Sequence, residues 1–136
     1  MVFFAPSDMR ARTFMLTAEI TNYPGEEDDI DLSANSSRDI VESYRRQDSS
    51  LVYIQLFDEQ VTNDNLLTSI RNLFDEAEEN DIIILYIHGH GYNGGYKTYD
   101  SWLDYGKLRK AMSYSKSTNK MIFADCCHSG SLRTNN

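Results

Sequence analysis

Two short segments of this chain bring reactive side chains together with glycine. An apolar run from Met121 to Ala124 stops at Asp125, followed by two cysteines, a histidine and a Ser-Gly pair. A second apolar run, residues 82–87, stops at a His-Gly-His-Gly stretch. A thiol nucleophile needs a base and an oxyanion hole, and glycine lets backbone N–H groups approach a substrate closely. The two segments therefore predict a Cys/His active site.

The base and the nucleophile have to be chosen among neighbouring residues. His90 is flanked by two glycines, on a turn, whereas His88 is still at the strand end and is expected to shape that turn. Side chains alternate along a strand, so Cys126 and Cys127 should point in opposite directions. Cys127 is nearer the Ser-Gly pair that leaves the strand. We assign Cys127 as the nucleophile and Cys126 to packing. His90 or His88 could exchange a proton with the thiol and the leaving amine if the two strands are neighbours.

These residues have three alternative interpretations. Most cysteines in proteins are inert small hydrophobes. Here, however, another strand ends in a Gly-His-Gly sequence, which favours a catalytic cysteine over an inert one. A serine hydrolase is disfavoured because Ser129 lacks the preceding glycine of a nucleophile elbow. A zinc site is disfavoured because the cysteines are adjacent, and metal-binding cysteines are usually two to four residues apart. Its possible ligands would be His88, His90, Cys126, Cys127 and His128.

The elements that would position these side chains alternate in type. Apolar patterning predicts strands at residues 13–20, 51–57, 81–88 and 120–125. Helices are expected from Ser36 or Ser37 to about residue 47, from a Thr62 cap to about residue 79, and from an Asp104 cap through residue 112. Residues 92–103 read as a Gly- and Tyr-rich loop. The order predicts an α/β fold with a mostly parallel sheet, helices on both faces, and both motifs at carboxyl strand ends, where ligands bind.

The composition of the chain indicates where the protein is located and which partners it can have. The chain has 136 residues, enough for one domain, and a formal net charge of −8 with a pI near 4.7. This charge argues against nucleic acid and anionic membranes as partners. No apolar run reaches the roughly 20 residues of a membrane span. Adjacent cysteines make poor structural disulfides, so we expect a reducing, cytoplasmic location.

Both motifs resemble those of caspase-like cysteine peptidases. Tyr86 to Gly91 is similar to the Ser-Gly-His-Gly motif of that family, and Asp125 to Gly130 matches the nucleophile motif of its metacaspase branch. Weaker agreement extends to the turn Asn22 to Gly25 and to the helix start at Val61 to Asn63. The resemblance implies a caspase-like three-layer sandwich over residues 1–136, corresponding to the large catalytic subunit.

The resemblance also implies roles for individual residues. His90 would be the catalytic histidine and Cys127 the nucleophile, with the backbone N–H groups of Gly91 and Cys127 as the oxyanion hole. Asp125 corresponds to the acid of the primary specificity pocket, which implies cleavage after Arg or Lys. The family places a second pocket acid at the start of the first helix, where this chain has Ser37.

The same resemblance implies which cofactors and partners to expect. No cofactor is required, although calcium activates many members of the family. Asp100 and Asp104 lie in the region of the calcium ligands without matching them residue by residue. The substrates would be proteins or peptides. A small-subunit chain or segment would complete the sheet and the substrate pocket.

Two alternatives to this endopeptidase stay open. One is a caspase-like effector of another P1 specificity in a defence or cell-death pathway. The other is a catalytically silent module that keeps the fold for binding and regulation. The presence of both His90 and Cys127 favours an enzyme.

Overall fold

The computed structural model describes residues 10–25, 30 and 37–126. Its centre is a four-stranded sheet in the order β2-β1-β3-β7, and every pairing in it is parallel. The strands are β1 (Thr13–Glu19), β2 (Val52–Phe57), β3 (Ile82–His88) and β7 (Asn119–Asp125). The predicted α/β fold with a mostly parallel sheet is confirmed, and β3 is an inner strand, as its apolar faces predict.

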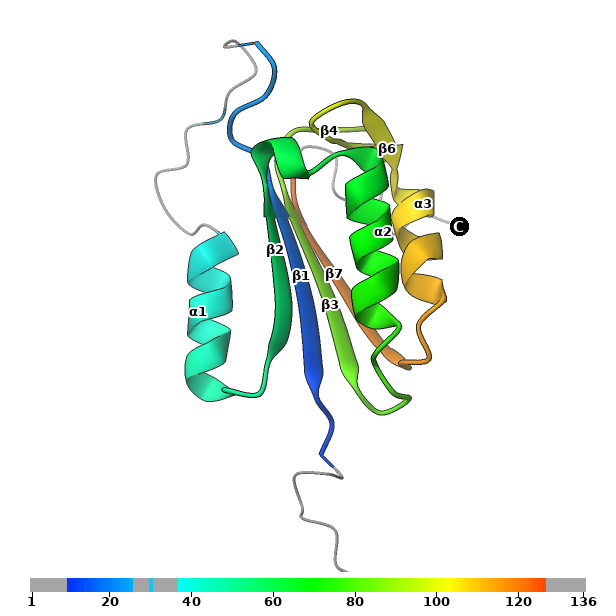
Figure 1. The fold of residues 1–136 in the computed structure, drawn as a ribbon. Helices are drawn as coiled ribbons and strands as arrows, with labels where there is room; N and C mark the ends of the chain where they lie inside the picture. Colours follow the sequence, from blue (N-terminus) through cyan, green and yellow to red (C-terminus); the bar gives the residue numbers. More distant parts are fainter. Residues whose placement is uncertain (1–9, 26–29, 31–36, 127–136) are drawn as a thin grey trace, which may run out of the picture.

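Helices cover both faces of this sheet (Figure 1). Helix α1 (Ser37–Gln47) lies on one face, along β1 and β2. Helices α2 (Asn63–Phe74) and α3 (Tyr105–Ser113) lie side by side on the other face. A short 3₁₀ turn, η3 (Asp58–Gln60), follows β2. The arrangement is compatible with a three-layer sandwich.

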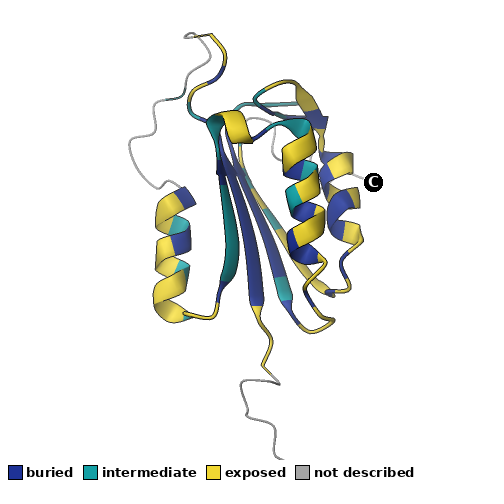
Figure 2. Cartoon of the chain, viewed as in Figure 1, coloured by how far each residue is buried: buried dark blue, intermediate teal, exposed yellow. Residues whose placement is uncertain are grey.

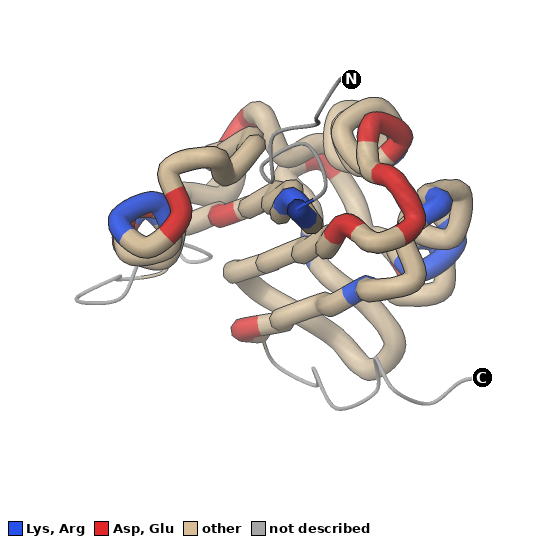
Figure 3. Tube along the Cα trace, turned by 90° about the horizontal axis from the view of Figure 1, so that it is seen from below, with Lys and Arg blue, Asp and Glu red and all other residues tan. Residues whose placement is uncertain are grey.

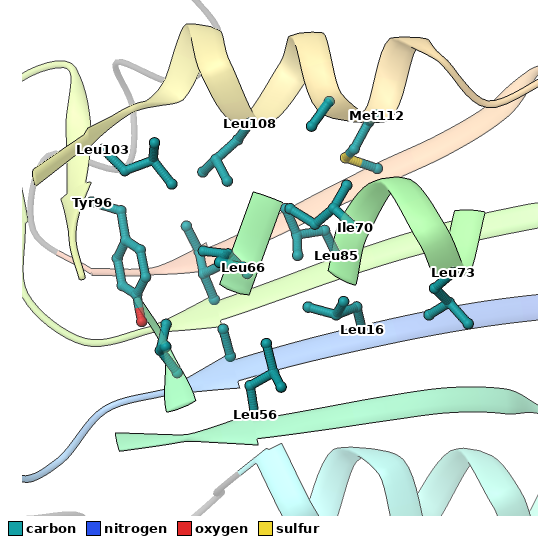
Figure 4. Close-up of a cluster of buried hydrophobic side chains, with 14 of the residues drawn as sticks. Leu16, Leu56, Leu66, Ile70, Leu73, Leu85, Tyr96, Leu103, Leu108 and Met112 are labelled. Atoms are coloured by element: carbon teal, nitrogen blue, oxygen red, sulfur yellow. The ribbon is translucent and has the colours of Figure 1, made fainter. Parts of the chain in front are cut away.

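The larger core lies between the sheet and the α2–α3 layer (Figure 4). Leu16 and Leu85 of the sheet face Leu66, Ile70 and Leu108 of the two helices, and all five are fully buried. A smaller core lies under α1 and consists of Met15, Val41, Leu51 and Ile84. The inner strands are almost wholly buried, whereas β7 and the outer side of α1 carry many exposed residues (Figure 2).

Helix α2 is shorter than its apolar pattern predicts. It begins after Thr62, whose side chain accepts the N–H of Asn65 as the predicted cap, but it ends at Phe74 rather than near residue 79. Beyond Phe74 the chain tightens, because Glu76 and Ala77 donate to carbonyls three residues back. Ala77 is buried in this turn, so it extends the apolar stripe without extending the helix.

Residues 91–104 form a second small sheet, so the prediction of a loop there was wrong. Strands β4 (Gly91–Tyr92), β5 (Gly95–Lys97) and β6 (Trp102–Asp104) pair antiparallel in that order. Asn93 and Gly94 connect β4 to β5, and Gly94 has φ +106°. An Asn-Gly pair is a strong hairpin signal, and here the short strands beside it obscured it. Helix α3 begins after Asp104 as predicted, but that side chain makes no cap.

Candidate active site

The two motif strands are neighbours, which is the condition that a Cys/His site at their ends requires. β3 pairs with β7 in parallel, and His88 is the register partner of Asp125 at the carboxyl ends of both. Just beyond, the N–H of Gly89 donates to the carbonyl of Asp125 at 3.4 Å. The His-Gly-His-Gly segment and the end of the Asp125–Cys126 segment therefore meet at one end of the sheet.

His88 lies inside this end of the sheet and Asp125 lies outside. Nε2 of His88 is 3.7 Å from Oδ2 of Asp125, and the two side chains are 10% and 68% exposed. Nδ1 of His88 is buried and has no hydrogen-bond partner among the described residues. The backbone carbonyl of His88 accepts hydrogen bonds from the N–H of Ile20 at 3.1 Å and from the hydroxyl of Tyr96 at 2.8 Å. These two bonds hold the backbone of the turn that leads to His90, while the role predicted for the His88 side chain stays a prediction.

His90 contacts Tyr23 through both its backbone and its side chain. The N–H of His90 donates to the Tyr23 hydroxyl at 2.8 Å, and that hydroxyl donates to the Lys97 carbonyl at 2.9 Å. The Tyr23 and His90 rings are stacked, with centroids 4.9 Å apart and planes 29° apart. The His90 carbonyl accepts the N–H of Lys97 at 2.9 Å. The small sheet and the turn after β1 together hold His90 at the strand end.

Gly89 is a position where the backbone requires glycine. Its φ is +151°, and a Cβ atom there would lie 2.5 Å from the Tyr23 hydroxyl and 3.1 Å from the Tyr96 ring. Any larger residue would displace the group that accepts the His90 N–H. Gly89 therefore permits the close approach of Tyr23 to the turn.

The position of Gly91 in the small sheet determines which way its N–H points. In an antiparallel pair, hydrogen-bonded and non-hydrogen-bonded residue pairs alternate. Lys97 donates to the His90 carbonyl, so these two residues form a hydrogen-bonded pair and the next pair, Gly91 with Tyr96, does not. The N–H of Gly91 consequently points away from β5. The β4–β5 ladder therefore does not use this N–H, and the oxyanion-hole role of Gly91 stays a prediction.

Cys126 faces the α2–α3 layer and packs there. It is half-buried against the larger core, and its Sγ lies 3.1 Å from the hydroxyl of Tyr105. This agrees with the packing role predicted from strand alternation. The predicted nucleophile Cys127, together with His128 and Ser129, lies outside the described residues.

The predicted pocket residues Ser37 and Asp125 lie at the same end of the sheet as Glu19. Glu19 is buried, is the register partner of His88, and accepts the N–H of Ser37 at 2.7 Å. Burial raises the pKa of Tyr86 to about 12, and the charges of Asp125 and Glu19 add to this shift. The carboxylates of Asp125 and Glu19 therefore both raise the pKa of Tyr86, which lies on the face of the sheet that α1 partly covers.

The two calcium candidates are engaged in hydrogen bonds within the protein. Asp100 accepts the N–H of Asn63 at 3.0 Å and the hydroxyl of Thr98 at 3.2 Å. Asp104 accepts the hydroxyl of Tyr92 at 2.6 Å. Within residues 10–25, 30 and 37–126, no three His, Cys, Asp or Glu side chains group as metal ligands would. Acidic and basic residues are interspersed along the trace (Figure 3).

Sequence patterns did not identify Tyr23 or Glu19 as parts of this site. The sequence predicts a turn at Tyr23, but its contact with His90 spans 67 positions of the chain. The apolar pattern includes Glu19 only as part of the first strand. An acidic residue near the end of an otherwise apolar strand was the available signal, since a buried charge requires a partner.

Comparisons with known proteins leave the family open. No protein-family model and no curated protein matches this chain. In the described part of the chain, none of the helices has the length and apolar character needed to cross a membrane.

Proposed function

We propose that this chain is the catalytic domain of a caspase-like cysteine endopeptidase that cleaves after Arg or Lys. The observation that carries the proposal is the pairing of β3 with β7, with His88 opposite Asp125. This pairing brings the ends of the histidine and cysteine motifs together, which a Cys-His dyad requires. The fold supports the proposal to the extent that it is an α/β sheet with helices on both faces.

In the proposed mechanism the Cys127 thiolate attacks the scissile carbonyl carbon. The N–H groups of Gly91 and Cys127 stabilise the oxyanion of the tetrahedral intermediate. His90, protonated by the thiol, gives its proton to the leaving amine, and an acyl-enzyme forms. His90 then takes a proton from water, which attacks the thioester. The C–S bond breaks, the carboxylic acid product leaves, and His90 returns the proton to the Cys127 thiolate.

The preference for a basic P1 residue rests on Asp125. Its carboxylate is largely exposed at the strand end, where it can pair with a guanidinium or ammonium group of a substrate. The family's second pocket acid is absent at Ser37, but the buried carboxylate of Glu19 lies directly beside this position. The proposal therefore places two negative charges near the substrate's basic side chain.

A partner segment beside β7 is part of the proposal. Among the residues that the structure describes, β7 has a strand on one side only. Its Met121 and Phe123 side chains are 40% and 52% exposed. They line an apolar hollow of about 390 Å³ together with Met15, Ile40, Tyr44, Ile84 and Tyr86. A small-subunit segment that adds a strand and covers this face would bury the exposed side chains.

Fluorogenic peptides test the proposal. We expect cleavage of peptides ending in Arg or Lys, not Asp, and loss of turnover in Cys127→Ala. Assays with calcium and with a chelator decide whether calcium is an activator, and reducing buffer matches the proposed cytoplasmic location. Turnover that survives Cys127→Ala would contradict the assigned nucleophile. If no peptide is cut, even with a small-subunit segment added, the result would favour the alternative of a binding and regulatory module.

A further inference from the structure

We propose that Tyr23 is a positioning residue for His90, which it orients for proton transfer. This inference rests on the proposed function of His90. Its first support is the path of the backbone hydrogen bonds. A hydrogen-bonded antiparallel pair normally exchanges two direct N–H···O=C bonds. Between His90 and Lys97 only one is direct, and the Tyr23 hydroxyl occupies the place of the other, accepting from His90 and donating to Lys97.

The second support is the side chain. The Tyr23 ring stacks on the imidazole itself, so one residue constrains both the backbone and the ring of His90. Tyr23 is itself fixed, because it is 5% exposed and packs with the larger core. The ammonium of Lys97 lies 5.1 Å from its ring centroid and 5.2 Å from that of Trp102. Contacts from β5 and β6 thus reach Tyr23, and through it His90.

The third support is the space made for Tyr23. The glycine at position 89 leaves the volume that the Tyr23 hydroxyl occupies, since a Cβ there would come within 2.5 Å of it. The turn after β1, the turn after β3 and strand β5 therefore converge on one hydroxyl. This convergence has an expected consequence for catalysis. An imidazole with a single orientation transfers its proton more often per encounter, so Tyr23 should affect kcat rather than substrate binding.

Three variants separate the parts of this role. Tyr23→Phe keeps the ring and removes the hydroxyl bridge, whereas Tyr23→Leu removes both the bridge and the stack. Tyr92→Phe is the matched control, because it removes a tyrosine hydroxyl bond within the small sheet, to Asp104, and leaves the bonds between Tyr23 and His90 in place. Unfolding of each variant by denaturant is measured first, and the kinetics are then compared under conditions in which every variant is folded.

We expect kcat to fall several-fold in Tyr23→Phe and about 100-fold in Tyr23→Leu, with KM within twofold of the wild type. Tyr92→Phe should keep both constants within twofold. A folded Tyr23→Leu variant with wild-type kcat would overturn the inference, as would an equal loss in Tyr92→Phe. If the wild type has no peptidase activity, NMR can still test the stacking of Tyr23 on His90. Ring-current shifts of the His90 imidazole protons that persist in Tyr23→Leu would refute the stack, whereas their loss in that variant alone would support it independently of the peptidase proposal.

Discussion

His88 and Asp125 are register partners across β3 and β7, and Nε2 of His88 lies 3.7 Å from Oδ2 of Asp125. One partner is buried and the other is largely exposed, so water screens the pair and it adds little to stability. The pair matters because it shows how the ends of β3 and β7 are aligned. The two strands end at the same level, and the next residues of each carry the groups proposed for catalysis.

Asp125→Asn should separate substrate recognition from stability. Removal of an exposed charge should change the free energy of unfolding by less than about 1 kcal/mol. Loss of the carboxylate for a basic P1 side chain should lower kcat/KM for Arg and Lys peptides by about 10-fold or more. Glu42→Gln on α1, another exposed acid, is the control and should leave kcat/KM unchanged. Equal kcat/KM values for wild type and Asp125→Asn would remove Asp125 from the pocket.

Gly89→Ala and Gly94→Ala form a matched pair. Both glycines have positive φ, but only a Cβ at Gly89 meets other atoms, whereas none lies within 4 Å at Gly94. Gly94→Ala should therefore cost only the backbone strain, about 1–2 kcal/mol. Gly89→Ala should cost about 1–3 kcal/mol more, because Tyr23 or Tyr96 must move. Urea denaturation measures both, and equal losses would show that the close approach at Gly89 is unimportant.

Stability should fall between pH 10 and pH 12, in part through Tyr86. The pKa of Tyr86 is raised from 10 to about 12 in the folded protein, by burial first and then by Asp125 and Glu19. The unfolded chain thus loses this proton near pH 10 while the folded chain keeps it, which favours unfolding as the pH rises. Tyr86→Phe should unfold with a shallower pH dependence in this range. An unchanged slope would show that Tyr86 titrates alike in both states.

Thr62→Ala tests the start of α2. The Thr62 hydroxyl accepts the N–H of Asn65 at 3.2 Å, so its removal should cost about 1 kcal/mol of unfolding free energy. Thr62→Ser retains an acceptor and should lose only a small part of this. Chemical denaturation followed by circular dichroism compares the two variants. A serine variant as unstable as the alanine variant would mean that the threonine methyl group, rather than the cap, matters.

The fold was largely predictable because its main elements have regular apolar patterns. The inner strands are apolar on both faces, and α2 and α3 each have one apolar stripe. The end of α2 was not predictable, because Ala77 continues the stripe while its backbone has already left the helix. Strands β4 to β6 were missed because they have two or three residues each and too short a pattern to read.

The site was predictable where it is local in sequence. The roles proposed for His90, Gly91 and Asp125 follow from short motifs, and the structure brings those motifs to one end of the sheet. The contact between Tyr23 and His90 arises only when the sheet forms, since Tyr23 follows β1 and His90 follows β3. The pairing of Glu19 with the start of α1 is likewise a tertiary contact that no local pattern contains.

The most direct test of the central claim is to map where a substrate-like electrophile reacts. A peptidyl chloromethyl ketone ending in Arg, which alkylates a thiolate with loss of chloride, would be incubated with the wild type, His90→Ala, Cys126→Ala and Cys127→Ala. The modified residue would be identified by peptide mass spectrometry. We predict one adduct on Cys127 in the wild type and in Cys126→Ala, a much slower reaction in His90→Ala, and none in Cys127→Ala. An adduct on Cys126, or a reaction rate independent of His90, would contradict the proposed Cys127–His90 dyad.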